Sequence, residues 1–157
     1  MERHIILISP DVHWNTGNIG RTCIGTGAFL HLVKPLGFSV DDKHVKRAGL
    51  DYWPKVKLKI WESFEEIVSS YNIANDELIF FSKLGKKIYT SMPQSERLFI
   101  VFGSETKGLP VELTEQYHEN LYYIPIMDDI RSLNLSTSAG IALYESLRST
   151  DFHQWHK

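Results

Sequence analysis

Short apolar runs alternate along the chain with segments whose apolar residues recur at helical spacing. The strand-length runs cover residues 5–8, 29–33, 78–82, 98–102 and 121–124, and residues 57–61 alternate between polar and apolar as a strand does. Helical spacing follows the first run through residue 27, and it returns over residues 64–71 and 136–147. This alternation predicts an α/β fold in which a mostly parallel sheet carries helices on both faces.

Polar residues mark where several of the predicted helices begin. Ser63 and Glu66 have the spacing of a capping box, which predicts a helix ending near Tyr71. Ser136 or Ser138 is the expected cap of the last helix. Asp41 or Asp42 is the expected cap of a short helix through Ala48.

Composition and length favour a single domain spanning residues 1–157. The hydrophobic fraction is 43% and the charged fraction 23%, which are typical of globular proteins. No Pro/Gly/Ser-rich linker or internal repeat divides the chain. No apolar run approaches the ~20 residues of a membrane span, and the start of the chain does not resemble a signal peptide, so we expect a cytoplasmic protein.

Charge, cysteine content and the C-terminal histidines predict no particular binding or catalytic site. The net charge of −2 gives no overall basic surface for nucleic acid, and the two basic clusters are expected to be solvated surface. These clusters are Lys43, Lys46 and Arg47, and Lys83, Lys86 and Lys87. Cys23 is the only cysteine, so we expect a buried hydrophobic side chain. His153 and His156 lack nearby cysteine or carboxylate partners, so no metal site is predicted there.

Three polar segments follow predicted strands, where ligands gather in parallel sheets. The first, residues 15–21, is predicted to be a loop with two asparagines and two glycines, which ends with Arg21 in the first turn of a helix. A guanidinium in that place suits a phosphate or a developing negative charge. An alternative is that Asn18 only caps the helix.

The second segment, residues 102–109, begins at the end of a strand and contains two glycines five residues apart. It is not a phosphate-binding P-loop, because Lys107 precedes the second glycine and Leu109 follows it. The nearest approach to a dinucleotide loop starts at Gly25, but Leu30 occupies the position of its third glycine. A plain tight turn would explain the glycines, but not the Glu and Lys between them.

The third segment, residues 124–136, runs from a strand end into the last helix. Its alternating Ser, Leu and Asn residues can surround an apolar ring while the backbone binds the polar edge of that ring. By itself this pattern is a weak indication of an adenine pocket.

Together the three segments resemble the motifs of the SPOUT class of RNA methyltransferases, in its SpoU (TrmH-like) branch. Nearly the whole chain takes part in the resemblance. It is strongest to the small type that methylates the wobble nucleotide of leucine tRNAs, because residues 37–38, 41–43 and 47–52 are similar to the stretch that marks that type. Two departures occur: Ser104 stands where that type usually has proline, and Trp53 where it often has histidine.

The resemblance implies a trefoil knot in the C-terminal part, a homodimer, and S-adenosylmethionine as the cofactor of a tRNA 2′-O-methyltransferase, with S-adenosylhomocysteine as product. It implies no metal and no membrane contact. The implied residues acting on the RNA are Arg21, Asn15, Glu105 and Asn134. The implied cofactor contacts are Phe81, Gly103, Ile124, Ile126, Ser132 and Leu133. Alternatives are methylation at another tRNA or rRNA site, a noncatalytic RNA-binding module of the same fold, or a small-molecule enzyme of unknown type.

Overall fold

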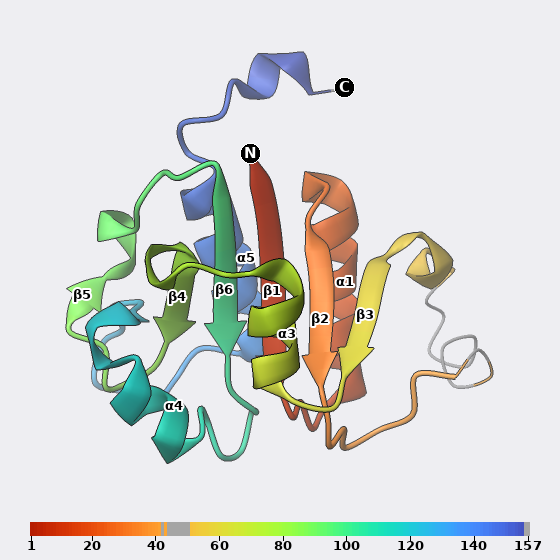
Figure 1. The fold of residues 1–157 in the computed structure, drawn as a ribbon, viewed down its shortest axis with the longest axis horizontal. Coiled ribbons are helices and arrows are strands. Elements are labelled where there is room, and N and C mark those ends of the chain that lie inside the picture. The colour runs from red at the N-terminus through yellow and green to blue at the C-terminus, as the bar shows by residue number, and fades with distance from the viewer. Residues whose placement is uncertain (42, 44–50, 156–157) are drawn as a thin grey trace.

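The computed structural model describes residues 1–41, 43 and 51–155, and a seven-stranded sheet forms its centre (Figure 1). The strand order is β3-β2-β1-β6-β4-β7-β5, and neighbouring strands pair in parallel. The strands are β1 (Glu2–Ile8), β2 (Phe29–Val33), β3 (Lys57–Trp61), β4 (Leu78–Phe81), β5 (Lys87–Ile88), β6 (Arg97–Phe102) and β7 (Leu121–Tyr123). The carboxyl ends of the parallel strands therefore lie along one edge.

Helices cover both faces of the sheet, as the alternation of apolar runs predicted (Figure 1). They are α1 (His13–Thr26), α3 (Phe64–Tyr71), α4 (Val111–Gln116) and α5 (Leu135–Ser146), with one-turn helices at Trp53–Lys55, Asn75–Glu77, Tyr89–Ser91, His118–Asn120 and Phe152–Gln154. Helices α1 and α5 pack side by side on one face, and α3 and α4 lie against the other. The central strands are buried on both sides, which is why they are almost continuously apolar.

Most predicted elements occur where the pattern placed them. The predicted strands at residues 29–33 and 57–61 match the observed bounds, and those at 78–82 and 121–124 end one residue earlier. Strand β5 was missed because its two residues are exposed and carry no apolar run. The helix expected from Asp41 or Asp42 to Ala48 falls largely on positions outside the described residues.

Two helix caps differ from the prediction. The Ser63 side chain accepts a hydrogen bond from the Glu66 amide, but the Glu66 carboxylate accepts from the Glu62 amide and not from that of Ser63. The expected cap of α5 at Ser136 or Ser138 is wrong. Asn134 caps this helix, because its side-chain oxygen accepts from the amides of Ser136 and Thr137.

The loop predicted over residues 15–21 is also wrong, because α1 begins at His13 and contains the whole segment. Asn18 is therefore inside the helix and caps nothing, and Arg21 lies about two turns from its start. Glycine and asparagine have low helix propensity, but tertiary packing overrides it here. Gly20, for example, lets α1 approach Trp53 closely: a Cβ at position 20 would lie 2.8 Å from the indole ring.

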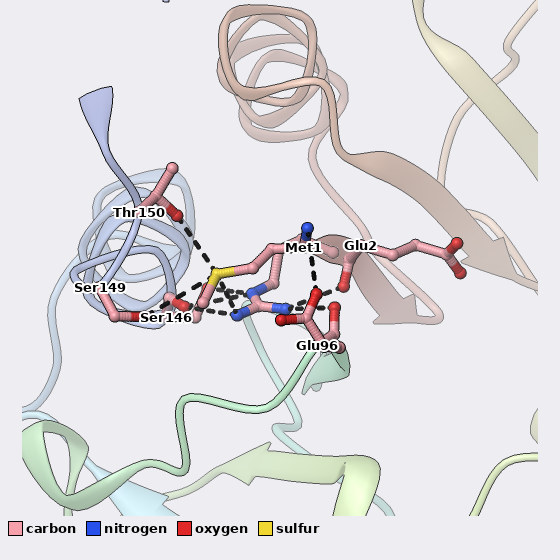
Figure 2. Close-up of polar contacts among 7 residues, drawn as sticks. Met1, Glu2, Glu96, Ser146, Ser149 and Thr150 are labelled. Carbon is pink, nitrogen blue, oxygen red and sulfur yellow. Dashed lines mark hydrogen bonds and ion pairs between the residues drawn. The ribbon is translucent and has the colours of Figure 1, made fainter. Parts of the chain in front are cut away.

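The buried side chain of Arg3 holds the far end of α5 against β1, and Figure 2 shows its partners Glu2, Glu96 and Ser146. Nε and Nη2 of Arg3 donate to the Ser146 carbonyl oxygen at 3.2 and 2.6 Å, and Nη1 donates to the carbonyl oxygens of Glu2 and Glu96. Burial lowers the pKa of Arg3. The guanidinium supplies donors to a carbonyl that the end of a helix leaves without a partner, so α5 is fixed at the end opposite Asn134.

A second buried polar group lies on the α3 face, where His4 and His31 share a hydrogen bond of 2.8 Å. Trp61 Nε1 donates to Nδ1 of His31, so the other ring nitrogen of His31 carries the proton and donates to His4. His4 in turn donates to the Glu2 carboxylate. Both imidazoles are therefore neutral. Burial lowers the pKa of both, that of His31 to about 3.

We predict that the stability of the fold decreases as the pH falls below about 6.5. The unfolded chain then binds a proton at His31 that the folded chain excludes until its pKa of about 3. This single group should cost about 2 kcal/mol of unfolding free energy by pH 5. Urea unfolding at pH 7 and pH 5 measures the loss.

The His31→Gln variant should lose clearly less stability than the unsubstituted protein over that pH interval. His118→Gln is the control, because His118 is exposed. Equal pH dependence in His31→Gln and the unsubstituted protein would show that the buried histidine pair does not cause the acid sensitivity.

Candidate active site

A cleft of about 980 Å³ opens at the carboxyl edge of the sheet. It lies among the segments that follow β4, β6 and β7 and the beginning of α1. Of the ten residues predicted for the site, every one except Arg21 lines this cleft: Asn15, Phe81, Gly103, Glu105, Ile124, Ile126, Ser132, Leu133 and Asn134. Its volume is within the range of sites that enclose small-molecule ligands.

A chain of hydrogen bonds joins the three predicted segments. The Glu105 carboxylate accepts from the amide of Asp11 at 2.8 Å, the amide of Val12 at 3.3 Å and Asn15 Nδ2 at 3.3 Å. The Asn15 side-chain oxygen then accepts from Asn134 Nδ2 at 3.0 Å. Asn15 is buried, and the hydrogen bonds that its side chain makes to Glu105 and Asn134 are partly buried.

The carboxylate of Glu105 also completes the start of α1. Val12 is the N-cap of this helix, and its side chain cannot accept a hydrogen bond. Glu105 comes from a different segment and binds the two amides that precede the helix. A negative charge near the N-terminus of a helix is favourable, and Thr106 adds a hydrogen bond of 2.6 Å to the Asp11 carboxylate.

The second segment is a closed turn with no space for a larger residue at its base. The backbones of Ser104 and Gly108 exchange two hydrogen bonds, and Gly108 has a φ of 67°. A Cβ at position 103 would lie 2.0 Å from the backbone carbon of Gly108. Gly103 therefore allows the turn to fold back on β6, and its backbone lies at the wall of the cleft.

Apolar side chains form much of the remaining wall. Phe81 stacks on Phe102 with ring centroids 5.2 Å apart, so it is both a core residue and a cleft residue. Leu133 and Ile124 are partly buried, while Ile126 and Ser132 are exposed at the cleft. Apolar surface beside backbone and hydroxyl groups is a setting that suits an adenine ring.

Arg21 lies outside the cleft of its own chain. It is exposed on α1, and its guanidinium lies 5.7 Å from the ring centroid of Tyr52. The Tyr52 hydroxyl donates to the Gly17 carbonyl oxygen, which fixes the ring beside the helix. The structure thus brings Asn15, but not Arg21, to the predicted cofactor segments.

Sequence patterns missed several residues that shape the site. Asp11 and Thr106 bind each other, and Gly85 packs against the backbone of Tyr122, where a Cβ would lie 2.4 Å from the carbonyl carbon. The turn pattern around Gly85 is a signal that could have indicated a constrained loop. The contact of Asp11 with Thr106 joins residues 95 positions apart and has no local signal.

The cysteine and the possible metal ligands form no further site among the described residues. Cys23 is buried, as predicted, and burial raises the pKa of its thiol to about 12. Among the described residues, no group of three or more His, Cys, Asp or Glu side chains lies close enough to hold a metal ion. Over the same residues, no helix has the length and apolar character needed to cross a bilayer.

The fold and the cleft define an α/β protein with a cofactor-sized site at the carboxyl ends of parallel strands. The sequence profile of the SpoU rRNA methylase family matches residues 2–144. The chain belongs to this family.

Relatives and solved structures agree with this assignment. A Listeria innocua protein, whose name gives it provisionally as a tRNA (cytidine(34)-2′-O)-methyltransferase, is 48% identical over 155 residues, 97% of this chain and 90% of its own length. A solved structure described as concerning 2-OH methylation of C/U34 on tRNA has a TM-score of 0.82 and 35% identity, and the match covers 94% of this chain and 95% of that one.

The cofactor of the family is S-adenosylmethionine. An rRNA methyltransferase of Sinorhizobium meliloti, solved with this cofactor bound, has a TM-score of 0.82 and 25% identity; the match covers 95% of this chain and 57% of that one. The cleft described above fits such a group, because Gly103 presents bare backbone between apolar walls. Phe81, Gly103, Ile124, Ile126, Ser132 and Leu133 remain the predicted residues that hold it.

Proposed function

We propose that the protein transfers a methyl group from S-adenosylmethionine to the ribose 2′-hydroxyl of the wobble nucleotide of a tRNA in the cytoplasm, with leucine tRNAs as the expected substrates. S-Adenosylhomocysteine would be the second product. The observation that carries the proposal is the hydrogen-bonded chain from Glu105 through Asn15 to Asn134 at one cleft. The names of the relatives support the wobble position.

The bound cofactor supplies an electrophilic methyl group on a sulfonium, so the protein mainly needs to orient the hydroxyl. Both Glu105 oxygens already accept hydrogen bonds, and the Asn15 and Asn134 side chains bind one another. We therefore assign these three residues to positioning. They keep the segments of the cleft in one arrangement, and none of them serves as the base that removes the proton.

We propose a homodimer in which Arg21 serves the cleft of the other subunit. Two observations support this arrangement: Arg21 is exposed on α1 outside its own cleft, and the same helix exposes 60% of Trp14. An arginine stays protonated, so its role would be to bind the phosphate and ribose rather than to act as a base. Pairing also joins the basic clusters of two weakly acidic chains.

A noncatalytic RNA-binding module of the same fold, or an enzyme acting at a different tRNA or rRNA site, is the alternative. The intact positioning chain around the cleft favours catalysis, since a module that only binds RNA does not need a preorganised cofactor cleft.

The reaction is tested with purified protein, radiolabelled S-adenosylmethionine, and separate pools of tRNA and rRNA. We predict label in tRNA, as a 2′-O-methylated nucleoside at position 34 of leucine tRNAs. Nuclease mapping and nucleoside chromatography identify the position. Label on a base or in rRNA would contradict the assignment, and an absence of label would favour the binding module.

The role of Arg21 is tested with Arg21→Ala. We predict that methyl transfer falls roughly 100-fold, because a group that orients the reacting ribose is lost, while cofactor affinity measured by calorimetry is unchanged. Arg148→Ala is the control, because Arg148 is an exposed arginine at the end of α5.

Mixed dimers decide whether Arg21 acts across the interface. Gly103→Ala leaves Arg21 intact but places a Cβ where the turn has no space. When equal amounts of the two variants are refolded together, about half of the dimers contain one subunit of each kind. Each mixed dimer has one complete site of two, so about a quarter of the normal activity should return. Normal activity of Arg21→Ala alone, or a mixture that stays inactive, would contradict the proposal.

A further inference from the structure

Three cationic side chains surround the cleft, and each comes from a different segment. Lys83 follows β4, Lys107 follows β6, and Arg131 follows β7. All three are exposed and line the cleft. No ion pair links any of them to another described residue, whereas Lys34 and Arg97 elsewhere on the sheet are paired with carboxylates. Their charge is therefore available to a ligand.

The turn that carries Lys83 has a fixed backbone. The Gly85 amide donates to the Ser82 carbonyl oxygen at 3.0 Å, and the Leu84 amide donates to Ser82 Oγ at 3.1 Å. Gly85 is pressed against the backbone of Tyr122, where no Cβ would fit. Lys83 thus projects from a turn that is anchored to β7, and its backbone needs no ordering when a ligand binds.

Lys107 projects from the closed turn of the second segment. Its amide donates to Ser104 Oγ at 3.0 Å, within the turn that Ser104 and Gly108 close. Arg131 lies three residues before Asn134, the cap of α5 and the last member of the positioning chain. Both cations therefore lie within three residues of a residue that holds the segments of the cleft in place.

The charge of the cleft is opposite to that of the whole chain. The protein has a net charge of −2, but among the described residues that line the cleft Glu105 supplies the one carboxylate. Its oxygens already accept three hydrogen bonds. S-Adenosylmethionine itself carries a sulfonium, an ammonium and a single carboxylate. The cofactor therefore offers a single negative charge to the three cations, and its own net charge is positive.

We infer that Lys83, Lys107 and Arg131 bind backbone phosphates of the substrate RNA next to the reacting ribose. This inference rests on the proposed function and adds to it the part of the RNA that the cleft recognises. A phosphate contact fixes the position of a strand without reading its sequence. The three cations would thus place the ribose at the cofactor, while recognition of the nucleotide comes from other contacts.

The test uses Lys83→Gln, Lys107→Gln and Arg131→Gln, singly and combined, with Lys86→Gln as the matched control. Lys86 is exposed in the same loop as Lys83 but does not line the cleft. The probe is a synthetic anticodon stem-loop of a leucine tRNA, and its dissociation constant is measured at several salt concentrations. Calorimetry gives the affinity for S-adenosylmethionine in parallel.

We expect the slope of log affinity against log salt, which is negative, to become less steep by about 2 in the triple variant, because each phosphate contact on a single strand contributes about −0.7. The control should keep the slope of the unsubstituted protein, and cofactor affinity should stay within about twofold in all variants. Each single variant should remove about one third of the effect.

An unchanged salt slope in the triple variant would overturn the inference. So would a loss of cofactor affinity with the slope preserved, because the cations would then bind the cofactor carboxylate. The proposed function fails by different results, namely methyl transfer to a base or to rRNA, or no transfer from the unsubstituted protein to any RNA. The salt slopes still decide the role of the three cations in that case.

Discussion

The carboxylate of Glu105 is the contact on which the site depends. It binds two backbone amides at the beginning of α1 and the side chain of Asn15, which binds Asn134 in turn. Hydrogen bonds to a charged group are stronger than neutral ones, at about 1.5–3 kcal/mol each. Through Asn15, the Glu105 side chain therefore connects three segments by hydrogen bonds that span 90 and 119 positions of the sequence.

The sheet and the two ends of α5 give this contact its fixed surroundings. Parallel strands bring the segments after β4, β6 and β7 to a common edge, where the cleft lies. Asn134 holds the start of α5 at that edge, and the Arg3 guanidinium binds the carbonyl of Ser146 at its other end. The helix that ends the third segment is thus fixed at both termini, so the cleft wall that it supports has little freedom to shift.

Local patterns predicted the parts of the protein that depend on local forces. The strand at residues 29–33 was found because an apolar run of strand length is a direct consequence of burial, and the strand at residues 57–61 was found from its alternation of polar and apolar residues. Most of the cleft residues were also predicted to belong to one site, but only from the motif resemblance. The start of α1 was misplaced, because its Asn and Gly residues favour a loop locally while Glu105, distant in sequence, completes the helix. The same error affected Arg21. Because the helix was predicted to begin too late, Arg21 was placed in its first turn, whereas it lies further along α1 and outside the cleft.

The substitution Glu105→Gln tests the central claim most directly, with Glu112→Gln as the control at an exposed position. Glutamine keeps the shape but replaces one acceptor oxygen with a donor that must face an amide. We predict that the affinity for S-adenosylmethionine, measured by calorimetry, falls at least about tenfold, as expected for the loss of 1.5–3 kcal/mol. The control should bind as the unsubstituted protein does. Unchanged cofactor affinity in Glu105→Gln would show that the hydrogen-bonded chain does not hold the cleft together.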